Sequence, residues 1–212
     1  MTTTSQPNDG PDEPTRAQAA EASDPLALFH QWLTEATAAE PNDPTSAALA
    51  TATPAGHPSV RMILLKPTDH HPFAFYTNSH SQKGDELSRN PHAALCLHWK
   101  SLRRQVRVEG LIHPLTPEAS DRYFHSRSRN SQIAAAISQQ SHTLSSREQL
   151  KSEFRDFAAR HPHEIPRPDH WQGFYIEPQK IEFWLDGPDR LHDRFLFTRT
   201  NQSEWRKSLL YP

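Results

Sequence analysis

The chain has 212 residues, of which 34% are hydrophobic, with a formal net charge of −2 and a single cysteine, Cys96. This length supports one domain with a substantial core, and no apolar run is long enough to cross a membrane. One cysteine excludes an internal disulfide framework and a cysteine-rich zinc site, and the near-neutral charge argues against a nucleic-acid coat or an electrostatic membrane clamp. The fourteen histidines show no metal-site spacing, so we predict no metal. The lack of a leader-like segment and the lone thiol predict a cytoplasmic location.

Residues 1–23 contain almost no large apolar side chain and predict a disordered tail. We expect a single ordered domain over residues 24–212. Asp24 is suited to cap a helix and Pro25 to be its first residue. Four apolar side chains then share one helical face: Leu26, Phe29, Trp32 and Leu33. The pattern predicts a packing helix that ends near Glu40.

The middle of the chain favours strands joined by short turns. Residues 47–53 and 59–66 resemble the two arms of a hairpin, and a helix is expected over 81–89. Further strands are predicted over 73–77, 93–99 and 104–112. In the last of these, Val106 and Val108 face one way, whereas Gln105, Arg107 and Glu109 face the other. The connections are too short for parallel crossovers, so the sheet should be antiparallel.

Helices are predicted over 117–126 and 131–138. A third should open at Ser145-x-x-Glu148, which has the form of a capping box, with Leu150, Phe154 and Phe157 on its buried side. Strand patterns resume over 173–176, 180–185, 195–198 and 204–209. The fold class is therefore mainly β with peripheral helices (α+β), as an antiparallel barrel or sandwich.

Cations and hydroxyls gather at three places. Arg61 and Lys66 bracket one strand, Tyr76-Thr77 ends a second, and Ser81-Gln82-Lys83 opens a helix. A helix N-terminus with a lysine and hydroxyls suits a phosphate, although a solvated charged turn fits the same residues. Tyr123 and Arg127, four apart on a helix, project together with Ser131 nearby and could hold a phosphate monoester; a cap plus a surface pair is the alternative.

The third place is Arg190-x-His192-x-Arg194, which in a strand would put two cations and an imidazole on one face, close in sequence to Trp184. The positive charges on such a face would repel one another unless the face bound anions. The basic run 103–107 is read as an exposed strand face, with Gln105 able to bond a heterocycle edge. Cys96 is expected to be an inert core residue. No serine-nucleophile elbow, dinucleotide fingerprint or Walker A loop occurs.

Seven segments in chain order carry a family resemblance: RMILLK (61–66), FYTN (75–78), SQKG (81–84), RRQVRVEG (103–110), YFHSRSRNSQI (123–133), QQS (139–141) and IEFWLDGPDRLHDRF (181–195). From about Asp24 to its end, the chain resembles the pyridoxine/pyridoxamine 5′-phosphate oxidases. The resemblance implies an FMN-binding split β-barrel that works as a homodimer with FMN at the subunit interface. It implies oxidation of phosphorylated B6 vitamers by O2, with hydride transfer to FMN, release of hydrogen peroxide and, from the amine, of ammonia.

Matching motifs imply a set of FMN-binding residues: Arg61, Met62, Ile63, Leu64, Leu65, Lys66, Tyr76, Thr77, Gln82, Lys83, Gln105, Gln140, Ser141, Trp184 and Arg194. They imply a second set that binds the substrate: Lys66, Tyr123, Arg127, Ser131, Arg190, Leu191 and His192. Within the second set, Arg190 and His192 would be catalytic, next to the carbon that is oxidised.

The chain departs from the family pattern at three points. Gln82 stands where members often carry arginine, Leu209 replaces another arginine, and residues 1–23 lack a basic or aromatic segment that could cover the substrate. The loss at Gln82 predicts weaker binding of the cofactor phosphate. Two other functions remain open: an FMN oxidase of another heterocycle, of the phenazine-biosynthesis type, and a non-catalytic flavin- or pyridoxal-phosphate-binding protein.

Overall fold

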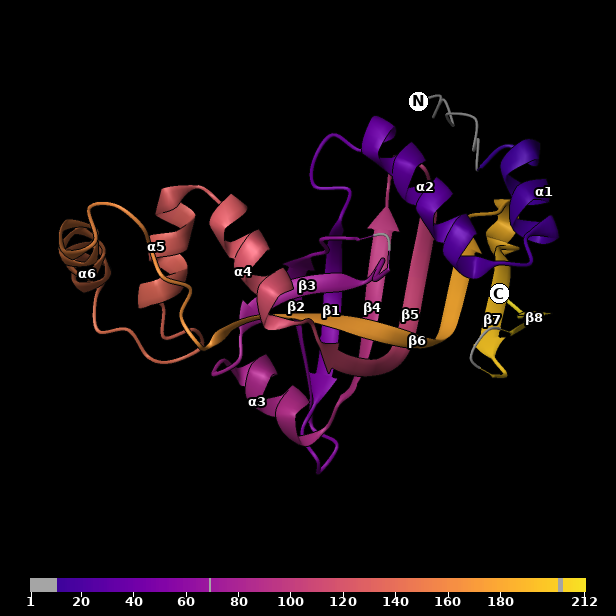
Figure 1. Cartoon of the computed structure of the whole chain (residues 1–212). Coiled ribbons are helices and arrows are strands. Elements are labelled where there is room, and N and C mark those ends of the chain that lie inside the picture. Colours follow the sequence, from indigo (N-terminus) through magenta and orange to yellow (C-terminus); the bar gives the residue numbers. More distant parts are fainter. Residues whose placement is uncertain (1–10, 69, 202–203) are drawn as a thin grey trace, which may run out of the picture.

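The computed structural model describes residues 11–68, 70–201 and 204–212. Within them, one antiparallel sheet of eight strands dominates, in the order β2-β1-β4-β5-β6-β7-β8, with β3 paired to β6 (Figure 1). The strands are β1 (Ser46–Ala52), β2 (Pro58–Leu64), β3 (Ala74–Asn78), β4 (His92–Trp99), β5 (Arg104–Pro114), β6 (Trp171–Leu185), β7 (Asp193–Arg199) and β8 (Trp205–Leu209). The helices are α1 (Glu13–Glu21), α2 (Pro25–Ala39), α3 (Gln82–Arg89), α4 (Pro117–Ser126), α5 (Arg129–Ile137) and α6 (Arg147–Arg160). The predicted antiparallel α+β fold is confirmed.

The main core lies between α2 and the inward face of the sheet. The predicted alternation of β5 holds, since Val106 and Val108 are fully buried whereas Arg107 is exposed. From α2, Trp32 meets Phe183 of β6 edge to face, with ring centroids 5.0 Å apart. Full burial of such aromatic side chains contributes about 2–3 kcal/mol each, which fixes α2 against the sheet.

A smaller apolar cluster holds the helices on the opposite side of the molecule. Phe124 of α4, Ile133 of α5, Ile165 and Trp171 are its buried members. Figure 1 shows α4, α5 and α6 grouped beyond the β3 end of the sheet, far from α1 and α2. This cluster therefore fixes α4 and the start of β6 next to β3. No helix in the described part of the chain is long and apolar enough to span a lipid bilayer.

The predicted disordered tail is wrong for residues 11–23, while residues 1–10 lie outside the described residues. Helix α1 occupies Glu13–Glu21, with Ala19 fully buried. Arg16 forms an ion pair with Asp193 of β7, and the Lys207 ammonium donates to the carbonyl groups of residues 19, 20 and 22 at the end of α1. These contacts join positions more than 170 residues apart, so the local composition carried no sign of them.

Other boundaries differ because tertiary pairing extends or shifts the elements. The two strands predicted over 173–185 form one continuous strand, β6, which pairs with β3 at its start and with β5 and β7 beyond. Ser146, rather than Ser145, caps α6, and Ser128 caps α5. On α6, Leu150 is exposed. Cys96 is only partly buried, because Leu95 and Leu97 take the inward face of β4; burial raises the pKa of its thiol.

Helix α3 approaches the preceding loop so closely that glycine is required at position 84. A Cβ built on Gly84 would lie 2.2 Å from the backbone oxygen of Ser79. We therefore expect Gly84→Ala to lower the free energy of unfolding by about 2–3 kcal/mol, because backbone must move to admit the methyl group. Chemical denaturation would measure this loss. Ser88→Ala, an exposed change on the same helix, should stay within about 0.5 kcal/mol, and equal stability of the two variants would contradict the steric explanation.

Candidate functional site

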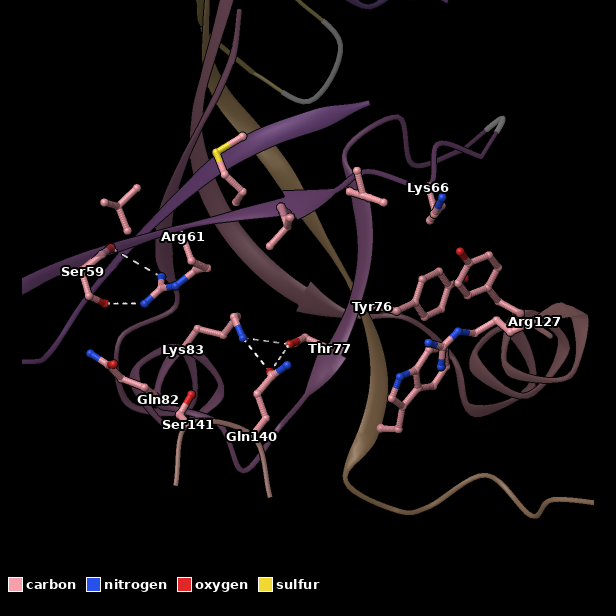
Figure 2. A pocket seen from close by; sticks show the side chains of 16 residues that line it. Ser59, Arg61, Lys66, Tyr76, Thr77, Gln82, Lys83, Arg127, Gln140 and Ser141 are labelled. Carbon is pink, nitrogen blue, oxygen red and sulfur yellow. Dashed lines mark hydrogen bonds between the residues drawn. The ribbon is translucent and has the colours of Figure 1, made fainter. Parts of the chain in front are cut away.

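A cavity of about 610 Å³ opens between β2, β3, α3 and α4, and we call it the β2–α3 pocket (Figure 2). Its size falls in the usual range for sites that bind small molecules. Most of the residues predicted for cofactor and substrate binding line it: Arg61, Met62, Ile63, Leu64, Lys66, Tyr76, Thr77, Gln82, Lys83, Tyr123, Arg127, Gln140 and Ser141. No acidic residue is among the described residues that line it.

One end of the β2–α3 pocket is built around the first turn of α3. Ser81 caps this helix and Lys83, only 7% exposed, follows in its first turn. The Lys83 ammonium donates to Gln140 Oε1 at 2.7 Å, to Thr77 Oγ1 at 3.2 Å and to Ser81 Oγ at 3.3 Å. Figure 2 shows Thr77, Lys83 and Gln140 meeting from three separate elements.

The charge at this end suits an anion. Burial, together with the positive charge of Arg61, lowers the pKa of Lys83 to about 8, and Glu86 opposes that shift. An anionic group bound beside Lys83 would stabilise its ammonium form, and the N-terminus of α3 adds a favourable dipole.

The loop that carries Gln140 and Ser141 is fixed by the buried Asn78, whose amide donates to the Ser138 carbonyl at 3.0 Å.

The other end of the pocket carries stacked aromatic rings and a second cation. Tyr76 stacks on Tyr123 with centroids 4.1 Å apart, and on Trp171 at 5.1 Å. The Arg127 guanidinium lies over the Trp171 ring, and its Nη1 atom is buried without a hydrogen-bond partner among the described residues. Burial lowers the pKa of Arg127 and raises that of Tyr76. A buried guanidinium nitrogen with no partner is available to donate a hydrogen bond to an oxygen of a ligand.

The helical reasoning for Tyr123 and Arg127 is wrong in detail. Helix α4 ends at Ser126, and Arg127 is its extended C-cap residue, yet both side chains reach the pocket. Ser131 does not line it. Its hydroxyl lies 2.8 Å from that of Ser128, which caps α5. Leu65 is fully buried in the main core rather than in the pocket.

Six predicted residues lie elsewhere on the same chain, and we call them the β6–β7 group: Gln105, Trp184, Arg190, Leu191, His192 and Arg194. None of them lines the β2–α3 pocket. Gln105, Trp184 and Arg194 stand side by side in register on β5, β6 and β7. The Trp184 and His192 rings are 4.7 Å apart. Within one chain, the predicted site is therefore divided into two parts.

The strand predicted to place Arg190, His192 and Arg194 on one face is not present. Pro188–Arg190 form a short 3₁₀ turn, in which Asp189 and Arg190 have φ angles of 54° and 64°, and β7 begins only at Asp193. Arg194 has an acidic partner, since it donates to Glu182 at 2.7 Å, which raises the pKa of Arg194. His192 Nδ1 accepts a hydrogen bond from the Gly187 backbone N–H at 3.0 Å and lies 3.0 Å from Asp186 Oδ1.

Three pocket residues were not predicted: Ser59, Val60 and Trp171. Ser59 and Val60 belong to β2. The alternation of side chains along this strand was the only sequence signal that could have placed them beside Arg61 and Met62 at the pocket. Val60, Met62 and Leu64 are 68%, 64% and 42% exposed, so the pocket is flanked by an uncovered apolar strip. Trp171 reaches the pocket only because β6 begins beside β3, a long-range pairing with no local signature.

The antiparallel barrel-like sheet and a pocket with a cation at each end define a class: small-molecule-binding proteins of the split-barrel type, suited to an aromatic ligand with anionic groups. Sequence profiles identify the family. The profile of pyridoxamine 5′-phosphate oxidase matches residues 33–161, and that of the pyridoxine 5′-phosphate oxidase C-terminal dimerisation region matches residues 171–212. The chain belongs to the pyridoxamine 5′-phosphate oxidase family.

Relatives and solved structures agree with this assignment. The chain is 53% identical to a pyridoxine/pyridoxamine 5′-phosphate oxidase of Erythrobacter litoralis, covering 90% of this chain and 92% of that protein. It is 52% identical to one from Rhodospirillum rubrum, covering 91% and 98%. Among solved structures, PhzG from Burkholderia lata, in complex with tetrahydrophenazine-1-carboxylic acid, superposes with a TM-score of 0.86 at 32% identity, covering 92% and 96%.

Proposed function

We propose that this protein is an FMN-dependent oxidase that converts pyridoxine 5′-phosphate or pyridoxamine 5′-phosphate to pyridoxal 5′-phosphate. Dioxygen is the acceptor, hydrogen peroxide is formed, and the amine substrate also yields ammonia. The observation that carries the proposal is the β2–α3 pocket, where buried Lys83 and half-buried Arg127 mark two separate anion sites on either side of aromatic and apolar walls. Two phosphate monoesters, one on the cofactor and one on the substrate, fit two such sites.

The residues at the α3 end fit the phosphate of FMN. Lys83, Arg61 and the hydroxyls of Thr77 and Ser141 line this end, and the N-terminus of α3 faces it. Exposed β2 side chains would lie along the flavin ring. FMN supplies hydride acceptance and reoxidation by dioxygen, and the protein supplies binding and orientation.

The substrate would bind at the aromatic end. Arg127, with its unpartnered Nη1, would hold the substrate phosphate together with Tyr123 and Lys66. We also keep Ser131 among the proposed substrate-binding residues. Its hydroxyl would have to turn from Ser128 toward the substrate when the substrate binds. The phosphate therefore positions the pyridine ring against the flavin.

The β6–β7 group would reach the pocket from a second copy of the chain. Three observations support a homodimer: the matched dimerisation region includes Trp184, His192 and Arg194; Leu191 and Leu209 are about 70% exposed; and β2 presents an uncovered apolar strip. In the dimer, Gln105, Trp184 and Arg194 of one protomer would contact the flavin held by the other. Arg190 and His192 would orient the hydroxyl or amine of the substrate, and His192 would accept its proton.

Oxygen consumption tests this function. Purified protein with FMN is expected to take up oxygen on addition of pyridoxine 5′-phosphate and to form the absorbance of pyridoxal 5′-phosphate. The likeness to PhzG favours one alternative, an oxidase of another heterocycle. Oxygen uptake only with a dihydrophenazine-type substrate would establish that alternative. Flavin binding without turnover on either substrate would indicate a binding protein.

A further inference from the structure

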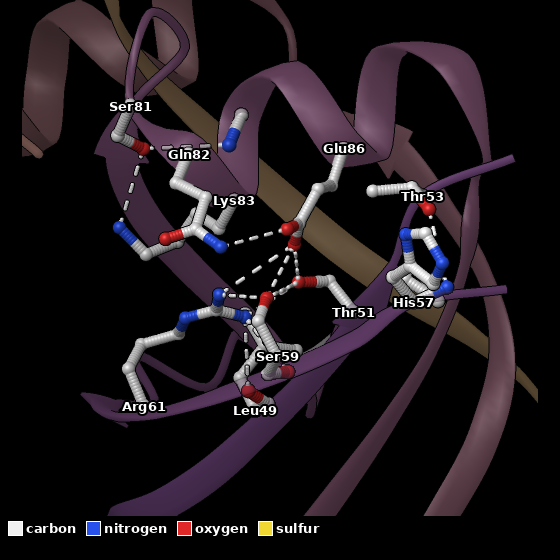
Figure 3. Close-up of polar contacts among 12 residues, drawn as sticks. Leu49, Thr51, Thr53, His57, Ser59, Arg61, Ser81, Gln82, Lys83 and Glu86 are labelled. Atoms are coloured by element: carbon white, nitrogen blue, oxygen red, sulfur yellow. Dashed lines mark hydrogen bonds and ion pairs between the residues drawn. The ribbon is translucent and has the colours of Figure 1, made fainter. Parts of the chain in front are cut away.

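Directly behind the β2–α3 pocket lies a buried carboxylate, Glu86, that faces Arg61 (Figure 3). Glu86 is 5% exposed and does not line the pocket itself. Its Oε2 accepts hydrogen bonds from the hydroxyls of Thr51 and, at 2.6 Å, Ser59, while its Oε1 accepts from Gln82 Nε2 at 3.0 Å. Three elements, β1, β2 and α3, therefore converge on one carboxylate.

The two hydroxyls connect Glu86 to Arg61. Arg61 Nη1 donates to Thr51 Oγ1 and Nη2 donates to Ser59 Oγ, each at 2.5 Å. Each hydroxyl has one proton, and here it is donated in a hydrogen bond to the Glu86 carboxylate. The lone pairs of the Thr51 and Ser59 hydroxyl oxygens therefore face the Arg61 guanidinium. The direct separation of Arg61 Nη2 and Glu86 Oε2 is 3.6 Å. Arg61 is thus held mainly by a relay of two oriented hydroxyls, with the Leu49 carbonyl at 3.2 Å and the longer ion pair with Glu86 as further contacts.

Glu86 stays ionised over all working pH values. Burial by itself would raise the pKa of this carboxyl, but hydrogen bonds from Ser59, Thr51 and Gln82, and the charge of Arg61, lower it to about 2. The carboxylate therefore acts as a permanent acceptor that keeps both hydroxyls in one orientation.

We propose that Glu86 is a positioning residue for phosphate binding, which holds Arg61 and Gln82 in place at the α3 end of the pocket. The proposal rests on FMN binding there. Gln82 is exposed, and Arg61 lies on β2 at the edge of the sheet, on the less exposed face that it shares with Ser59, so both side chains depend on polar contacts to hold one position. Fixing them before the ligand arrives lowers the entropy lost on binding.

A competing electrostatic effect has the opposite sign. A carboxylate near a bound phosphate repels it, so removing Glu86 could strengthen binding. The relay argues against this outcome, because Arg61 lies between the two anions. The charged groups that act on Lys83 are Arg61 on β2 and Glu86 on α3, while its contacts on β3 and the 138–146 loop, Thr77 and Gln140, are neutral. Without Glu86, Lys83 would lose its proton at lower pH.

The test compares Glu86→Gln with Asp85→Asn in apoprotein titrated with FMN by fluorescence quenching. Asp85 lies on the same helix, is exposed and pairs with Arg89, so its substitution makes the same change in charge without touching the relay. We expect Glu86→Gln to weaken FMN binding about tenfold at pH 7, and Asp85→Asn to change it less than twofold. The alkaline loss of affinity should begin at lower pH in Glu86→Gln than in the wild type. Riboflavin, which lacks the phosphate, should bind both variants equally.

Unchanged or tighter FMN binding by Glu86→Gln would overturn the positioning role. If that variant does not fold, Ser59→Ala removes one arm of the relay while leaving Glu86 in place. It should then weaken FMN binding about threefold, and no change would equally refute the proposal. Wild-type protein that binds no FMN would instead refute the proposed function, so the two failures are distinguishable.

Discussion

Replacing Arg190 by alanine should reduce kcat/KM for pyridoxine 5′-phosphate by at least about a hundredfold, while leaving the FMN content nearly unchanged. Arg190 lies outside the β2–α3 pocket, exposed in a turn where its backbone is left-handed. Its proposed partner is the substrate, so its loss removes orientation of the reacting group rather than a cofactor contact. Steady-state oxygen uptake and flavin absorbance measure the two quantities on the same preparation.

The matched control for Arg190→Ala is Arg155→Ala, which removes an exposed arginine from α6, and it should retain wild-type turnover. Arg190→Lys keeps the charge but not the two-pronged geometry, so we expect it to recover only part of the activity. If Arg190→Ala lost flavin in proportion to activity, Arg190 would belong to the cofactor site instead.

Lys83→Ala should weaken FMN binding by about ten- to a hundredfold, the value of a hydrogen bond between charged groups. In the proposed complex, the ammonium form of Lys83 would bind the phosphate. Because the pKa of Lys83 is about 8 in the free protein, FMN affinity should fall as the pH rises above that value. Lys83→Met should show weak binding with little dependence on pH from 7 to 9. An identical alkaline decline in wild type and variant would show that another group titrates.

The same shift in pKa has a consequence for stability. Lys83 has a folded-state pKa of about 8, below its ordinary value of 10.5. Between these values the unfolded chain binds more protons, so the stability of the apoprotein should rise as pH increases from about 8 to about 10.5. Lys83→Met should lack this contribution and be at least as stable as the wild type at pH 7. Lower stability of Lys83→Met would mean that the three hydrogen bonds of the ammonium outweigh its burial.

The sequence predicted those parts of the fold and site that depend on local pattern. The alternation around Val106 and the helix that opens at Ser81-Gln82-Lys83 are properties of a few neighbouring residues, and both are as predicted. Most residues of the β2–α3 pocket were likewise predicted, by motif. Helix α1 was missed because its stability depends on Lys207 and Asp193, far along the chain. The division of the predicted residues into two groups was not predicted, because the order of motifs along a sequence does not say which of them lie together on one chain.

Residues with no recognisable motif were the hardest to foresee. Glu86 looks like any acidic residue of a surface helix until β1 and β2 bring Thr51 and Ser59 against it. Trp171 gains its place from the pairing of β6 with β3. In both cases the role arises from contacts between elements, which a single sequence does not encode at neighbouring positions.

The unbroken course of β6 bears on how a dimer would behave. Trp171, the first residue of β6, lines the β2–α3 pocket of its own chain. Trp184, near the other end of β6, would enter the β2–α3 pocket of the second subunit. At about 3.3 Å per residue, one strand roughly 40 Å long would thus contact both FMN sites of the dimer. Binding of FMN at one site of the dimer would then act on the same strand, β6, that lines the other site.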